Sequence, residues 1–91
     1  MKTENLVDKY IRNTKKAFQG LKHSFNETED KGILDYARRY LEDAEYYRSQ
    51  KKFETALVSI VYCEGLLDAL RLLGIVEFQW PEEAQKKQID R

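Results

Sequence analysis

Three ionisable side chains near the end of an apolar segment are the strongest candidates for chemistry in this sequence. Glu64, Asp68 and Arg71 recur at three- and four-residue intervals within residues 62–74, which read YCEGLLDALRLLG. In an α-helix these three positions fall within about 60° of one another. Two carboxylates and a guanidinium so placed could form an ion cluster or line a polar groove for a ligand.

The direction of this charged stripe decides between those roles. Its helical phase matches that of Phe53, Leu57 and Ile60 in the preceding turns, so we expect the stripe to continue a core-facing side. A buried charge without a partner costs several kcal/mol, and the cluster would therefore need further ionic contacts. The sequence leaves open whether the stripe points into the bundle, into a cleft or out to solvent.

The neighbours of the stripe support two interpretations. In the first, Arg38 or Arg39 from the preceding segment completes an internal ion cluster. In the second, the stripe lines a ligand or peptide groove, and Gly65 marks a surface that another helix or molecule must approach, since a mid-helix glycine costs about 1 kcal/mol relative to alanine. The tyrosines that could border such a groove are Tyr36, Tyr40 and Tyr62.

The residues that usually carry catalysis or hold metals are scarce. His23 is the only histidine and belongs to no Glu-x-x-His pairing of the kind found in di-metal helical bundles. Cys63 lies among apolar neighbours, where a thiol is ordinarily an inert core group. We therefore expect no catalytic site, no metal and no cofactor, and we do not expect an enzyme.

Composition limits the class of protein. Sixteen basic and sixteen acidic residues cancel in a chain of 91, so the whole molecule has no net charge to attract nucleic acid or an anionic membrane. One cysteine excludes an internal disulfide, and the N-terminal sequence lacks the apolar segment of a signal peptide. We expect one small, soluble domain in the cytoplasm.

The spacing of apolar residues predicts an all-α protein. Residues at three- and four-residue steps predict helices over about residues 3–25, from about residue 31 to 49, and over about residues 52–73. Residues 26–31 (NETEDK) supply the capping residues and first-turn acids that begin a helix. Gly74 suits the left-handed position that ends one.

Short connections between these helices predict an antiparallel up-down-up three-helix bundle over residues 1–74. The third helix is apolar nearly all round, so we expect the other two to enclose it. Residues 75–91 form a C-terminal extension, in which an apolar start precedes a short polar helix opened by Pro81.

Two further surfaces are candidates for binding. Residues 1–25 carry six basic and two acidic side chains, which could contact a phosphate backbone or simply be solvated. The basic patch comprises Lys9, Arg12, Lys15, Lys16 and Lys22. The extension starts with apolar side chains that either seal the end of the bundle or contact a partner, namely Ile75, Val76, Phe78 and Trp80.

The two C-terminal helices resemble a known family. Tyr62, Glu64, Gly65, Asp68 and Gly74 lie in a segment similar to the YAEGxLDAxxxLG pattern of the archaeal domain of unknown function 357 (DUF357) family, with Cys63 where a small residue such as alanine is usual. The resemblance covers about residues 33–78. It implies a short three-helix cytoplasmic protein and no assigned activity.

The sequence therefore favours a non-enzymatic module that binds a protein partner or a second copy of itself through the extension and the end of the third helix. Nucleic-acid binding by the basic first helix is one alternative. Small-ligand binding at the stripe of Glu64, Asp68 and Arg71 is the other. No membrane contact is expected.

Overall fold

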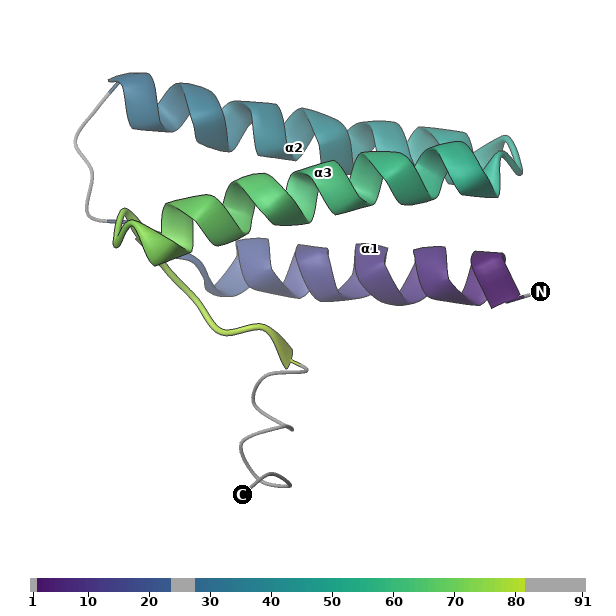
Figure 1. Cartoon of the computed structure of the whole chain (residues 1–91), viewed down its shortest axis with the longest axis horizontal. Coiled ribbons are helices and arrows are strands. Elements are labelled where there is room, and N and C mark those ends of the chain that lie inside the picture. The colour runs from purple at the N-terminus through teal and green to yellow at the C-terminus, as the bar shows by residue number, and fades with distance from the viewer. Residues whose placement is uncertain (1, 24–27, 82–91) are drawn as a thin grey trace.

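A computed structural model describes residues 2–23 and 28–81 and confirms an all-α, three-helix bundle. Helices α1 (Lys2–Gly20), α2 (Thr28–Ser49) and α3 (Phe53–Leu72) run antiparallel in sequence order, and α3 lies between the other two in Figure 1. Two short strands, β1 (Lys22–His23) and β2 (Val76–Glu77), pair near one end of the bundle.

Helix α1 buries one narrow side. Val7, Ile11, Thr14 and Ala17 are its buried residues, and their three- and four-residue steps match the predicted pattern. The helix ends at Gly20, whereas the sequence predicted a helix to about residue 25. The prediction was wrong because the next residues form strand β1, whose partner is 53 residues further along the chain.

Helices α2 and α3 are joined by the tight antiparallel turn that the short connection predicted. Lys51 adopts a left-handed backbone with φ of 62°, an unusual conformation for a residue with a side chain. The turn is closed by hydrogen bonds from the Lys51 amide to the Arg48 carbonyl and from the Lys52 amide to the Tyr47 carbonyl, each 2.9 Å long. This arrangement satisfies carbonyls left unpaired at the end of α2.

Helix α3 supplies the largest share of the core among the described elements. Ile60, Cys63, Leu67 and Leu70 are almost completely buried, and α3 as a whole packs against both α1 and α2. The opposite side of α3 is nevertheless exposed, which contradicts the prediction that two helices enclose it. Because α1 and α2 contact each other as well as α3, they leave one side of α3 uncovered, and that side is apolar.

The chain leaves α3 through a well-defined cap. Gly74 has φ of +79°, as predicted, and its amide donates to the Arg71 carbonyl while the Ile75 amide donates to the Leu70 carbonyl. These two bonds form a Schellman motif. The chain then turns back, so that Val76 is buried and pairs with His23.

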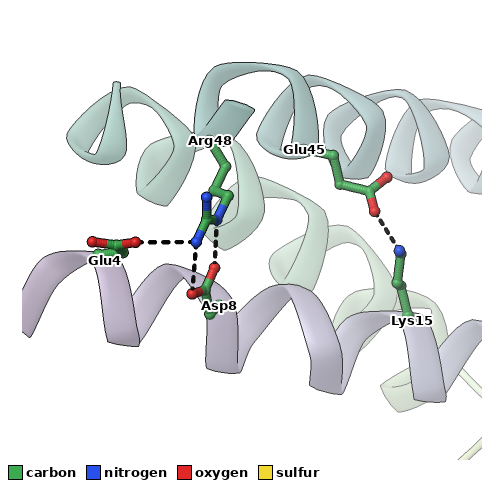
Figure 2. Close-up of polar contacts among 5 residues, drawn as sticks. All are labelled: Glu4, Asp8, Lys15, Glu45 and Arg48. Carbon is green, nitrogen blue, oxygen red and sulfur yellow. Dashed lines mark hydrogen bonds and ion pairs between the residues drawn. The ribbon is translucent and has the colours of Figure 1, made fainter. Parts of the chain in front are cut away.

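Ion pairs join α1 to α2 along their exposed seam (Figure 2). The Arg48 guanidinium on α2 donates to both Asp8 carboxylate oxygens, at 2.7 and 3.1 Å, and to Glu4 at 3.1 Å. Further along the seam, Lys15 on α1 pairs with Glu45 on α2. Some of the basic and acidic side chains of α1 and α2 are thus paired with each other within the fold.

Candidate functional site

The charged stripe lies at the surface. The side chain of Asp68 is 43% exposed and that of Arg71 is 26% exposed. One Asp68 oxygen, Oδ1, accepts hydrogen bonds from Arg71 Nε at 3.1 Å, Arg71 Nη2 at 2.9 Å and Trp80 Nε1 at 3.0 Å. The bond from Trp80 is the main reason that the pKa of Asp68 is lowered, and Arg71 lowers it further.

The expectation that this stripe faces the core was wrong. The centre of the stripe is rotated by about 100° around the helix from the centre of the buried side of α3, which consists of Ala56, Ser59, Ile60, Cys63, Leu67 and Leu70. Glu64 and Asp68 therefore lie on the flank of the helix. Because α3 is apolar on nearly every side, its sequence does not reveal which side packs.

The predicted partners of the stripe are engaged elsewhere. The Arg38 guanidinium lies 4.9 Å from the centre of the Phe18 ring, and that of Arg39 lies 5.4 Å from the centre of the Tyr36 ring. Trp80, which the sequence analysis assigned only to the extension, is the residue that reaches Asp68. A contact between residues on two different elements leaves no local pattern in the sequence.

Two shallow hollows meet at Gly65. One, of about 280 Å³, is lined by Val61, Glu64, Gly65, Asp68 and Trp80. The other, of about 240 Å³, is lined by Val61, Tyr62, Gly65 and Leu66. Both lie at the surface of α3, and neither places a set of polar groups around an enclosed space, as a small-ligand site usually does.

An apolar surface extends along the solvent side of α3, and we call it the outer face. Its large side chains are strongly exposed, with Val58 at 57%, Val61 at 50%, Tyr62 at 60% and Leu72 at 75%. Leu73, beside it, is 73% exposed. The outer face consists of Val58, Val61, Tyr62, Gly65, Ala69 and Leu72. None of the six carries a charge.

Gly65 lies in the middle of the outer face. A Cβ atom built at this position would have no side chain or neighbouring element of the described structure within 4 Å. The fold of the single chain therefore gives no packing reason for a residue that weakens a helix by about 1 kcal/mol relative to alanine.

Aromatic side chains border the outer face on the side of α2. The rings of Tyr40 and Tyr62 stack with centroids 5.3 Å apart and planes inclined by 17°. Tyr36, one turn earlier on α2, is 57% exposed. Tyr62 and Tyr40 thus mark the α2 side of the outer face, whereas Asp68 lies at its opposite edge.

The residues of the bundle also match a family. The sequence model for the family described as protein of unknown function DUF357 matches residues 9–76. The chain belongs to the DUF357 family. No curated protein and no solved structure matches it significantly. The match contains the whole outer face and ends before Phe78 and Trp80. The family has no assigned function, so membership brings no catalytic assignment to this chain.

The basic patch of this DUF357 chain is divided. Lys15 pairs with Glu45 at the seam with α2, whereas Arg12, Lys16 and Lys22 are exposed. Lys9 is half-buried and has a contact of its own. The structure therefore brings part of the predicted patch into internal ion pairing, and its role toward nucleic acid stays a prediction.

The apolar start of the extension packs on the DUF357 bundle. Ile75, Phe78 and Trp80 contact the core cluster to which Val76 belongs, and the Phe78 and Trp80 rings meet edge to face with centroids 4.8 Å apart. These side chains are therefore partly buried against the bundle. Their contact with a partner stays a prediction.

The remaining chemical groups are few. Cys63 is fully buried, and burial raises the pKa of its thiol to about 12, so the thiol stays protonated at neutral pH. Among the described residues, no three histidine, cysteine or acidic side chains are grouped as metal ligands would be. None of the helices in that same part of the chain is long and apolar enough to cross a membrane.

Proposed function

We propose that this DUF357 chain is a non-enzymatic protein-interaction module and that the outer face of α3, with Leu73 beside it, is the surface it presents. The observation that carries the proposal is the exposure of four large apolar side chains along one helix. Together with Leu73, they leave on the order of 500 Å² of apolar surface in water, a size that in monomers often marks a functional surface.

This location changes the emphasis of the sequence-based hypothesis. The end of the third helix remains in the interface through Leu72. The extension, by contrast, buries part of its apolar surface against the bundle, since Val76 is only 2% exposed. Aromatic residues such as Tyr62 often dominate binding energies because they bury much area and lose little conformational entropy.

The same proposal has two further parts: the protein is not an enzyme, and it is located in the cytoplasm. Cys63, with its protonated thiol, is a poor nucleophile. A single buried thiol is compatible with a reducing compartment. Asp68, the acid with a lowered pKa, is already bonded to Arg71 and Trp80 and serves to hold the extension in place.

Site-specific photocrosslinking in cells that naturally carry the gene would test the surface. Benzoylphenylalanine in place of Tyr62 should yield a covalent product with whatever protein covers the outer face. Tyr46 is a matched control, because it is a tyrosine with 59% exposure on α2, compared with 60% for Tyr62.

A product from position 62 that is missing at position 46 is the expected result. Equal labelling at both positions, or none at position 62, would refute the outer face as an interaction surface. The mass of the product would show whether the covering protein is a second copy of the chain or a different protein.

A further inference from the structure

We infer that the outer face pairs with the outer face of a second copy of this chain, and that the two α3 helices cross antiparallel with Gly65 at the two-fold axis. The inference rests on the proposed function and names the occupant of the same surface. It follows from the open space around Gly65, the order of residues around it and the exposed area.

Gly65 is the first reason. No packing within the described chain requires a glycine there, yet the residue lies in the middle of the exposed apolar face of α3. When two helices cross, their backbones come nearest at one point, and a glycine at that point lets them approach most closely. The hollows on either side of Gly65 give space for side chains of the opposing helix.

The order of residues is the second reason. Val58 and Leu72 lie seven residues before and after Gly65, and Val61 and Ala69 lie four before and after it. A two-fold axis through Gly65 therefore sets Val58 of one copy opposite Leu72 of the other, and Val61 opposite Ala69. A surface that is complementary to itself in this way is what an isologous dimer requires.

Burial of apolar surface, rather than charge, selects the antiparallel direction. One edge of the outer face is formed by Tyr62 and Leu66, and the other by Glu64 and Asp68. In an antiparallel crossing the two apolar edges lie together, and the two polar edges lie together at the rim. A parallel pair would instead set each apolar edge against a polar one.

The exposed area is the third reason. The large side chains of the face and Leu73 expose on the order of 500 Å² in each copy, compared with about 800 Å² from each partner in a standard interface. The flanking residues of the two copies would supply the remainder. The surface is thus of the size that a small, reversible homodimer needs.

Analytical ultracentrifugation of the full chain at concentrations up to about 1 mM tests the inference. The wild-type protein should show a monomer–dimer equilibrium. Gly65→Gln should raise the dimer dissociation constant at least tenfold, because a long side chain at the crossing point keeps the helices apart.

Gly32→Gln is the matched control. Gly32 is also an exposed helical glycine with open space around its Cα, but it lies on α2. Both substitutions should raise the melting temperature of the monomer through better helix propensity. Only Gly65→Gln should lose dimer, and a wild-type chain that stays monomeric, or an equal effect of both variants, overturns the inference.

Crosslinking with a short bismaleimide tests the direction. An equimolar mixture of Val58→Cys and Leu72→Cys chains should give a product that joins position 58 to position 72. Products that join only like positions would overturn the antiparallel arrangement. The native Cys63 is buried with a pKa of about 12, so it should stay unlabelled.

These results are separable from the proposed function. A monomeric wild-type protein that still gives a specific product from position 62 in cells would leave the outer face as an interaction surface for a different protein. Absence of that product would instead remove the proposed function itself.

Discussion

At Asp68, one carboxylate oxygen connects helix α3 to the segment that follows β2. It accepts bonds from Arg71 in the last turn of α3 and from Trp80 in the segment after β2. Because Trp80 also packs edge to face on Phe78, the hydrogen bond fixes an aromatic pair against the bundle. Asp68 therefore anchors the extension by a hydrogen bond at the edge of the outer face.

The hydrogen bonds of Asp68 should make its contribution to protein stability depend on pH. Its folded pKa is lowered, chiefly by the Trp80 hydrogen bond, so the stabilisation is present above the ordinary value of 3.8 and is lost as the pH falls through the folded pKa. Trp80→Phe keeps an aromatic ring but removes the donor, and the pKa of Asp68 should rise toward 3.8. A carboxyl NMR titration measures the pKa of Asp68 in the wild-type protein and in the variant.

Asp8 is the internal control in the same spectra. Its pKa is also lowered, but by Arg48 at the far seam, so Trp80→Phe should leave it unchanged. An unaltered Asp68 pKa in the variant would show that Trp80 does not bond this carboxylate in solution.

Thr14 leads to a second prediction at this scale. Its side chain is fully buried, and its hydroxyl has no hydrogen-bond partner among the described residues. Thr14→Val replaces the hydroxyl with a methyl group of similar size and should stabilise the protein by about 1 kcal/mol, because an unsatisfied buried polar group is removed. Urea denaturation measures the free energy of unfolding.

Thr55→Val tests whether that gain is specific. Thr55 is exposed on α3, so the same change there should alter stability by less than about 0.5 kcal/mol. A destabilised Thr14→Val protein would mean that the hydroxyl has a partner, such as a bound water, inside the bundle.

At the scale of elements, the sequence predicted the helices better than their ends and faces. The spacing of Val7, Ile11 and Ala17 was sufficient to place α1 and its buried side. The end of α1 was wrong because Lys22 and His23 pair with distant residues in β2.

The orientation of α3 could not be predicted for a different reason. Its apolar residues occupy nearly the whole circumference, so Val58 and Val61 look as suited to the core as Ile60 does. Only the arrangement of α1 and α2 decides which side is covered, and that information is not local. The exposure of the outer face and the flanking position of Asp68 could not be predicted for this reason. The bond from Trp80 was missed because Trp80 and Asp68 lie on different elements.

The turn between α2 and α3 carries a prediction about backbone conformation. Lys51 has φ of 62°, where a side chain is disfavoured and glycine is not. Lys51→Gly should therefore stabilise the protein by about 0.5–1 kcal/mol, even though glycine loses more entropy on folding. Thermal and urea denaturation should agree on the sign.

Gln50→Gly provides the contrast. Gln50 is next to Lys51 but does not have a positive φ, so glycine there brings only its entropic cost and should destabilise. Equal destabilisation by both substitutions would contradict the left-handed conformation of Lys51.

At the scale of the molecule, α1 and α2 contact α3 and each other through different kinds of interaction. Both pack on α3 through apolar side chains, whereas their seam with each other consists largely of exposed ion pairs. Exposed pairs contribute little individually, but Arg48 contacts two carboxylates, and its guanidinium bonds both oxygens of the Asp8 carboxylate in the two-bond geometry that strengthens such pairs.

Arg48→Gln should destabilise the bundle in a way that depends on pH and salt. The Arg48 hydrogen bonds are the main cause of the lowered pKa of Asp8, so the variant should bring that pKa back toward 3.8. The stability difference from wild type should be constant near neutral pH, shrink as the pH falls through the folded pKa of Asp8, and decrease at high ionic strength.

Lys15→Gln separates this effect from general surface electrostatics. It breaks the Lys15–Glu45 pair on the same seam and should also lose its effect in salt, but it should leave the pKa of Asp8 unchanged. If instead both variants shift the Asp8 titration equally, the lowered pKa comes from the basic charge of the seam as a whole. If neither does, the Arg48–Asp8 contact is not maintained in solution.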